Sequence, residues 1–394
     1  MGCIRPRELA AAYSLDPLDL LNTCLRLTRH HQLHLIWDCR CPGCKGPKES
    51  FQHLSNLKPV AYCESCAIQY GVAFDQNLEL SFQPAREIRP VRELFFCAGS
   101  PANTPHISWQ ANILPEQDLR THLDLEPGYY VLRTLLCPNE ISILIELDGE
   151  AFMEVEILEQ LQLKMASEQT YVRLQPGASL RVSNQRTVTC TLLLENIAWQ
   201  SQTISAADVQ SVQTFHDLFP DEVLAPDESL PLQCQVFLLA YTPPQSAVTS
   251  ELQELCHQLI QQHQGAATVL APERTLGIFA SAYEALAAAW DLRQELSGLN
   301  LMYEQTECLV LALSKGPCEV YSDGQRLNYR GPAIYELESA REQCQDGVIA
   351  RESFFQDADL AIFLESPETE WLRVPDPEGN DWLHMREKVL ETIW

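Results

Sequence analysis

The sequence predicts a multidomain α+β protein, because three stretches of the chain have different patterns. Residues 1–76 combine helical segments with two Cys-x-x-Cys motifs. Residues 77–204 contain short alternating or β-rich runs between Pro-Gly and Asp-Gly turns, which is typical of a β-sandwich or jelly-roll. Residues 232–365 alternate short strands with helices, which indicates a mixed sheet covered by helices. We expect a linker at 205–231 and an acidic, amphipathic tail at 366–394.

Composition limits the class of protein. The chain has 394 residues, of which 46% are hydrophobic and 21% charged, as in soluble globular proteins. It contains no run of 18 apolar residues and no apolar N-terminal segment, which predicts neither a membrane span nor a secretory signal. Its 15 cysteines, an odd number, favour free thiols in a reducing cytoplasm over a disulfide scaffold.

The formal net charge of −27 makes a nucleic-acid partner improbable for the chain as a whole. Residues 1–60 differ, since eight Lys and Arg residues stand there against five Asp and Glu. Helices at 7–13 and 16–29, followed by a strand at 34–37, would suit a winged helix that offers phosphates Arg26, Arg29, His30 and His31. The alternative is a small helical cap that packs on the next domain.

The two Cys-x-x-Cys motifs are the most specific chemical signal in the chain. Cys41 and Cys44 form one pair, and Cys63 and Cys66 form the second, 18 residues later. Zinc takes four thiolates in a tetrahedron, and a two-residue gap lets one tight turn present two sulfurs to one ion. We therefore predict a closed, structural Zn²⁺ site. A redox pair or unrelated buried thiols are the alternatives, and Cys39 could replace Cys41 in another register.

The expected elements of the C-terminal domain follow in order. The chain predicts a strand at 236–239, a helix opened by Ser250 with Gln253 completing a capping box, and strands at 268–270 and 275–279. An alanine-rich helix at 282–296 and a strand at 308–313 follow. Asp323-Gly324 marks a hairpin, after which we expect a helix from Pro332 and a final strand at 361–364.

Three motifs in this order give the domain a family resemblance. They are His263-Gln264-Gly265, the segment from Gly316 to Val320, and the segment from Arg326 to Pro332. The domain resembles the class III adenylate/guanylate cyclase domain, which implies a ferredoxin-like α/β fold. Residues 10–224 also resemble a cysteine-bearing domain of unknown function that precedes the cyclase domain in some bacterial members. The resemblance covers most of residues 10–364.

The residues that would carry cyclase chemistry are replaced. Cyclases of this class hold two metal ions on two carboxylates, and Tyr241 occupies the first of these positions, followed by Pro244 and Gln245 in the phosphate-binding turn. The resemblance places Glu273 at the second carboxylate. The positions for the base, the ribose and the transition state hold Val269, Asn328, Tyr335 and Ser339.

We therefore expect a pseudoenzyme with no catalytic or cofactor-binding residues in its cyclase-like domain. We expect a regulatory, sensory or assembly role. It would be exerted through a protein partner or through self-association, since cyclase domains of this family normally form dimers. One alternative is a residual adenylate or guanylate cyclase that uses Glu273. The other is a transcriptional regulator that uses the N-terminal helices. The end of the tail is expected to form a helix that packs on the domain or docks a partner.

Overall fold

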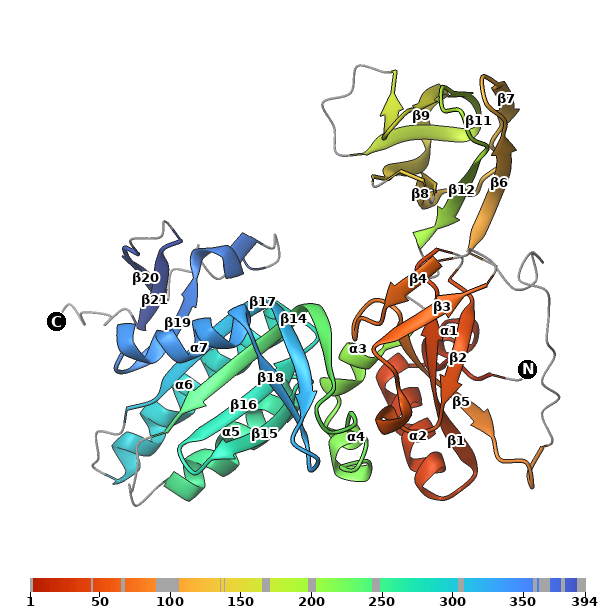
Figure 1. Cartoon of the computed structure of the whole chain (residues 1–394). Coiled ribbons are helices and arrows are strands. Elements are labelled where there is room, and N and C mark those ends of the chain that lie inside the picture. Colours follow the sequence, from red (N-terminus) through yellow and green to blue (C-terminus); the bar gives the residue numbers. More distant parts are fainter. Residues whose placement is uncertain are drawn as a thin grey trace.

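The computed structural model contains an N-terminal unit, a β domain and a C-terminal domain (Figure 1). Two short helices join the N-terminal unit to the C-terminal domain. It describes residues 3–43, 45–64, 68–89, 106–134, 136–137, 139–164, 171–197, 203–242, 249–303, 308–356, 360, 369–376 and 380–387. Within these ranges, none of the helices is both long and apolar enough to cross a membrane.

The N-terminal unit is built on a four-stranded antiparallel sheet with the order β13-β5-β1-β2. Its elements are α1 (Pro6–Tyr13), α2 (Pro17–Arg29), β1 (Leu33–Arg40), β2 (Pro47–Phe51), η1 (Leu54–Asn56), β3 (Val60–Cys63), β4 (Ile68–Gly71), β5 (Leu78–Pro84) and β13 (Ile204–Ser205). We expect residues 78–82 to be the first strand of the β domain, but in the structure they belong to β5, which pairs with β1 along its length. The β domain is therefore inserted between β5 and β13 of one sheet.

Helix α2 begins at the cap residue Asp16, whose carboxylate accepts the backbone N–H of Asp19 at 2.8 Å. It buries Leu21, Cys24 and Leu25 against β1 and the linker helix α4. This packing is that of the helical cap considered in the sequence analysis.

The β domain is one seven-stranded sheet with the order β6-β12-β8-β9-β11-β7, and β10 pairs with β9. Its strands are β6 (Ile107–Ile113), β7 (Asp118–His122), β8 (Gly128–Thr134), β9 (Ile141–Ile157), β10 (Leu161–Leu163), β11 (Val172–Asn184) and β12 (Cys190–Asn196). Alternate side chains of these strands form one buried apolar cluster. We expect a β-sandwich of two sheets here, but the structure has one continuous sheet whose strands surround a single buried core.

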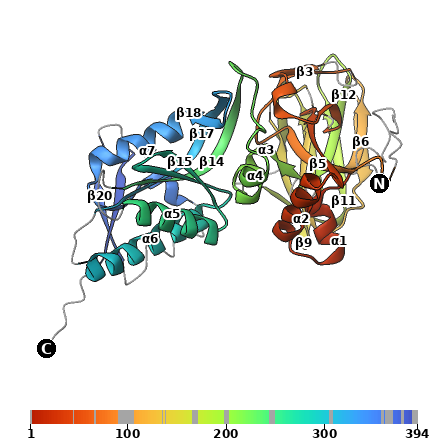
Figure 2. The same cartoon turned by 90° about the horizontal axis from the view of Figure 1, so that it is seen from below.

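The segment at 205–231 is a folded part of the core. It contains α3 (Ala206–Gln210), which begins with a capping box between Ser205 and Asp208, and α4 (Gln213–Leu218). Val209, Val212 and Phe215 are buried in the same apolar cluster as Trp37 of β1 and Phe237 of β14. Figure 2 shows both helices lying between the N-terminal unit and the C-terminal domain. The expected linker therefore joins the two cores.

The C-terminal domain has an eight-stranded mixed sheet with the order β15-β16-β14-β17-β19-β21-β20, and β18 pairs with β17. Its elements are β14 (Ser229–Tyr241), α5 (Thr249–Gln262), β15 (Ala266–Ala271), β16 (Arg274–Phe279), α6 (Ala282–Tyr303), β17 (Val310–Ser322), β18 (Leu327–Arg330), α7 (Pro332–Gln343), β19 (Gly347–Arg351), η4 (Glu352–Gln356), β20 (Thr369–Val374) and β21 (Trp382–Glu387). Helices α5 and α6 cover one face, and α7 packs on the other. The hairpin at Asp323-Gly324 is confirmed.

Two expectations about the end of the chain differ from the structure. The strand that follows α7 is β19, which pairs parallel with β17, whereas the expected strand at 361–364 lies outside the described residues. The tail extends the sheet, because β21 pairs with β19 and β20 pairs with β21. The amphipathic helix expected there is wrong for residues 382–387, and the remaining residues of the tail are not described.

Candidate functional site

The cysteine motifs stand at the turns of two β-hairpins. Cys41 directly follows β1 and begins the turn toward β2, where its N–H donates to the carbonyl of Gly46 at 3.1 Å. Cys63 ends β3, ahead of the turn toward β4. Both residues are fully buried. Cys44 and Cys66 lie outside the described residues.

The chemistry of the described cysteines fits a metal site. The backbone N–H of Gly43 points at Cys41 Sγ at 3.3 Å, which stabilises a sulfur that carries negative charge. Burial, followed by the nearby groups Cys39, Cys41 and Cys63, raises the pKa of the Tyr70 hydroxyl. Cys39 Sγ lies 3.8 Å from that hydroxyl. Among the described residues, no group of three metal-binding side chains is complete. Cys44 and Cys66 would have to supply the remaining thiolates.

In the C-terminal domain, Tyr241, which we expect at the position of the first metal carboxylate, is a buried aromatic residue. Tyr241 ends β14, is 7% exposed, and directs its hydroxyl toward the carbonyl of Leu337 at 3.5 Å. The guanidinium carbons of Arg274 and Arg341 lie 5.6 and 5.2 Å from the centroid of this ring. Burial raises the pKa of the Tyr241 hydroxyl, which keeps it neutral. Of the two guanidinium groups at this end of β14, that of Arg274 is paired with the Glu338 carboxylate at 2.9 Å.

The other residues expected at cyclase positions make separate local contacts. Asn328 donates to Asp323 Oδ2 at 3.0 Å within its hairpin, and Ser339 donates to the carbonyl of Tyr335 at 2.8 Å within α7. Val269 is 46% exposed on β15 and Tyr335 is 63% exposed on α7. Tyr241 belongs to the buried core, so it cannot share an exposed contact surface with Val269 and Tyr335. Pro244 and Gln245 lie outside the described residues.

Val269 and Tyr335 also lie on different sides of the sheet. The neighbours of Val269 along β15, Thr268 and Leu270, line a pocket on the face that α7 covers. Because successive side chains of a strand point to opposite faces, Val269 points to the other face, toward the side of α5 and α6. A partner that contacts Val269 and one that contacts Tyr335 would therefore use two different surfaces.

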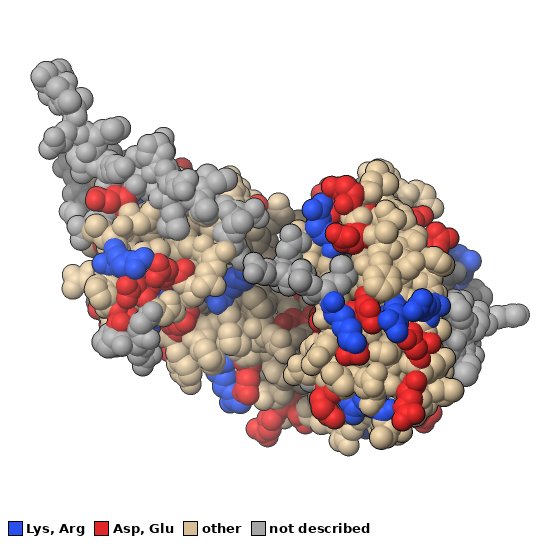
Figure 3. All heavy atoms as spheres, turned by 90° about the horizontal axis from the view of Figure 1, so that it is seen from above, with Lys and Arg blue, Asp and Glu red and all other residues tan. Residues whose placement is uncertain are grey.

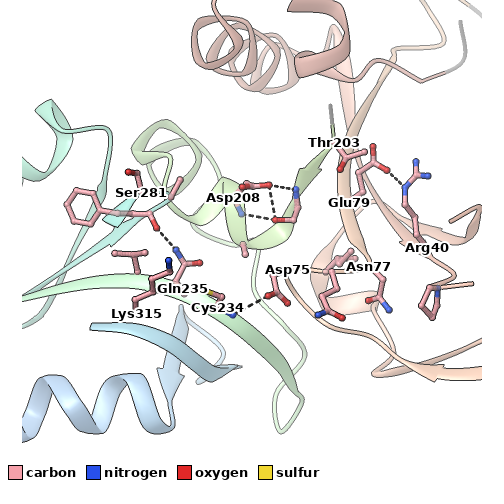
Figure 4. Close-up of a pocket in the computed structure, with 18 of the residues that line it drawn as sticks. Arg40, Asp75, Asn77, Glu79, Thr203, Asp208, Cys234, Gln235, Ser281 and Lys315 are labelled. Atoms are coloured by element: carbon pink, nitrogen blue, oxygen red, sulfur yellow. Dashed lines mark hydrogen bonds and ion pairs between the residues drawn. The ribbon is translucent and has the colours of Figure 1, made fainter. Parts of the chain in front are cut away.

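A polar cavity of about 750 Å³ lies between the N-terminal unit and the C-terminal domain (Figure 4). Asp75 on one side accepts the backbone N–H groups of Gln233 and Cys234, at 3.0 and 3.2 Å, at a bulge of β14. On the other side, the Gln235 amide donates to the carbonyl of Phe279 at 2.7 Å. Cys41 also lines the cavity, which places the first cysteine hairpin at the joint between the two units.

A buried carboxylate, that of Glu222, joins the linker to the N-terminal unit. Glu222 accepts hydrogen bonds from Trp37 Nε1 at 3.1 Å and from the Leu54 N–H at 3.0 Å, and its other oxygen lies 2.7 Å from His53 Nδ1. Neither Asp75 nor Glu222 was found from the sequence. Their partners are more than 150 positions away, and no local motif marks them.

Comparisons with known proteins found one family model and a set of solved structures. A family model described as a family of unknown function (DUF5939) matches residues 3–110. A comparison with curated proteins gave no match. The adenylyl cyclase CyaB from P. aeruginosa is 8% identical over 41% of this chain and 96% of its own, with a TM-score of 0.33.

Two further solved structures are similar at the same level. The adenylate/guanylate cyclase/hydrolase from Silicibacter pomeroyi is 12% identical over 40% of this chain and 97% of its own, with a TM-score of 0.31. The non-canonical dimeric guanylyl cyclase domain of the RhoGC fusion protein from Blastocladiella emersonii is 10% identical over 40% and 98%, also with a TM-score of 0.31. Each likeness is one of fold and covers about two-fifths of this chain.

Proposed function

We propose that this protein is a catalytically inactive, cyclase-like regulatory or assembly factor of the cytoplasm that acts through protein contacts. The position of Tyr241 carries the proposal. A divalent ion needs negative oxygen ligands there, and the chain offers a neutral, buried ring between two guanidinium groups. The Tyr241 ring offers no anionic oxygen to a metal ion, and Glu338, whose charge acts on the ring, already pairs with Arg274 at 2.9 Å. The second carboxylate position, Glu273, would therefore lack the first carboxylate with which it would share two metal ions.

The fold of the C-terminal domain then serves to hold other parts in place. Its sheet shares an apolar cluster with the linker helices and the N-terminal unit, and the Asp75 bonds fix the joint. A structural zinc ion, held by Cys41, Cys44, Cys63 and Cys66, would stiffen the hairpin that lines the joint. The protein would present its outer surfaces to a partner or to a second copy of itself.

An activity assay with the full chain tests this proposal. With ATP or GTP and either magnesium or manganese, we expect no cyclic nucleotide above a protein-free blank. Loss of one electrostatic contributor typically costs a factor of roughly a hundred to a thousand, and several such groups are replaced here. Turnover that Glu273→Ala abolishes, and that Glu338→Ala leaves in place, would establish the alternative of a residual cyclase.

A further inference from the structure

The linker and the C-terminal sheet enclose a second cavity, here called the linker pocket. It has a volume of about 370 Å³ and lies between residues 210–223 and the sheet face formed by β15, β16 and the β17–β18 hairpin. Phe215, Phe219, Leu270, Leu276 and Ile278 provide apolar walls. The rings of Phe215 and Phe219 are stacked, with centroids 5.8 Å apart and an angle of 26° between their planes. The size and walls are those of a small-molecule site.

The linker pocket contains a buried amide that has no partner. Gln210, the last residue of α3, is 1% exposed, and neither its Oε1 nor its Nε2 makes a hydrogen bond within the protein. The hydroxyl of Tyr329, which also lines the pocket, is likewise buried without a partner. Buried polar groups are nearly always paired, so these two call for a ligand or for water.

The charged groups around the linker pocket are already matched. Arg274 pairs with Glu338 at 2.9 Å, and Arg326 donates to the carbonyl of Val269 at 3.1 Å. Glu222 is held by the three contacts described above. His216 Nε2 lies 2.8 Å from the carbonyl of Gln210, and burial lowers the pKa of this ring, which keeps it neutral. A charged ligand would enter without a free counter-charge.

We propose that the linker pocket binds a small, neutral, planar molecule with a carboxamide or lactam edge, which pairs with the amide of Gln210. A glutamine amide offers a donor beside an acceptor, and an amide or lactam edge presents the complementary pair. The stacked phenylalanine rings suit a flat guest, and the Tyr329 hydroxyl supplies a further hydrogen bond. The site goes beyond the proposed function, since it needs neither cyclase chemistry nor a protein partner.

Binding of three simple probes to the full chain tests this inference. Benzamide carries the amide and a flat ring, benzoate replaces the amide with a charge, and cyclohexanecarboxamide keeps the amide on a puckered ring. In an NMR titration with saturation transfer, we expect saturable binding of benzamide and at least tenfold weaker binding of the other two. For benzoate, that factor corresponds to the loss of about one hydrogen bond. For cyclohexanecarboxamide, it reflects the loss of a flat ring against the phenylalanine rings.

Variants locate the binding in the linker pocket. Gln210→Leu keeps the volume of the side chain and removes the amide, so it should weaken benzamide binding about tenfold while the fold survives, because an unpaired polar group is replaced by an apolar one. Tyr329→Phe should weaken it several-fold. Gln185→Leu, an exposed position in the β domain, is the matched control and should change nothing.

Two results would overturn the inference. The first is the absence of saturable benzamide binding up to its solubility limit, which would mean that the pocket holds water only. The second is benzamide binding that Gln210→Leu leaves unchanged, or that benzoate matches. The cyclase assay does not bear on either result, so this inference and the proposed function fail separately.

Discussion

Cys41 and Cys63 are fully buried on two different hairpins. A third thiol, that of Cys39, lies 3.8 Å from the hydroxyl of Tyr70, a residue of the second hairpin. Buried cysteines of this kind are either uncharged thiols in an apolar core or thiolates that bind a metal ion. The Gly43 N–H that points at Cys41 Sγ favours the metal, because a thiolate gains more from that contact than a thiol does.

The first prediction is a zinc content of about one ion per chain. Cys63→Ser should abolish it and raise hydrogen exchange over residues 35–75, since such sites couple metal binding to local folding. Cys190→Ser, an equally buried cysteine of the β domain, is the control and should keep the metal. Comparison of Cys39→Ser with Cys41→Ser by metal analysis decides which of the two binds. Protein purified without chelators and free of zinc would contradict the prediction.

The second prediction concerns His216, whose pKa is lowered by burial. Below the ordinary histidine pKa of about 6.5, the unfolded chain takes up a proton that the folded chain does not. The free energy of unfolding should therefore fall as the pH drops from 7 to 5. His216→Gln should make this fall smaller in urea titrations at each pH, and His122→Gln, on the surface of the β domain, serves as control. An unchanged slope in His216→Gln would refute it.

Helix α4 is the element that unites the N-terminal unit with the C-terminal domain. The ring of Phe215 packs edge-on against Trp37, with 6.2 Å between their centroids, and Gln213 Oε1 accepts the N–H of Ala267 at 2.8 Å on the edge strand β15. Arg326 donates to the carbonyl of Val269 on the same strand. The edge of the sheet is thus partly capped from within the chain, which limits pairing with other strands.

The third prediction follows from this packing. Phe215→Ala should lower the free energy of unfolding by about 3–5 kcal/mol, as is typical of a fully buried phenylalanine. It should also separate one unfolding transition into two, because the two units would lose their shared core. Calorimetry and urea titration measure both effects. Phe152→Ala, a half-exposed position of the β domain, is the matched control. A single transition with a loss below about 1 kcal/mol would place the connection elsewhere.

The sequence predicted most elements of the C-terminal domain, and the exceptions have a physical cause. Trp382, Leu383 and Met385 suggested a helix, because a short apolar run has no clear period. In β21, Trp382 joins the cluster beneath α7, and Leu383 and Met385 join the cluster beneath α5 and α6. Both faces of this strand are buried, so it lacks the alternation that marks an exposed strand. The β-branched pair Val348-Ile349 could have revealed β19.

For the whole molecule, the net negative charge outweighs the local excess of Lys and Arg residues at the N-terminus. Arg5 pairs with Glu79, and Arg7 pairs with Asp208 of α3, so part of that excess is neutralised within the protein. On the face shown in Figure 3, basic and acidic groups are interspersed over the described residues. These two ion pairs reduce the support for the alternative of a transcriptional regulator that uses the N-terminal helices, which needs a continuous basic surface.

Less of the candidate sites than of the fold could be predicted. The spacing of the four cysteines is local, and the place of Tyr241 at the end of its strand can be read from the flanking residues. The linker pocket and the Glu222 contacts join residues about 60 to 185 positions apart, and no periodicity encodes such pairs. Only the packing of α3 and α4 against the sheet brings Gln210 to Tyr329 in one cavity.

The last prediction is that the full chain self-associates or binds a protein through one of two exposed surfaces. Tyr335, on α7, and Val269, on β15, lie on different sides of the sheet, so two single changes identify the contact. Tyr335→Arg should weaken the complex at least tenfold if the α7 side is used, because an aromatic anchor of a contact is worth about 2 kcal/mol or more. Val269→Glu should do so if the other side is used.

Sedimentation velocity over a range of concentrations measures both effects, and Tyr129→Arg, at a position 61% exposed on the β domain, is the control. A strictly monomeric chain that no partner binds, or a complex indifferent to both changes, would move the contact to the β domain or the N-terminal unit.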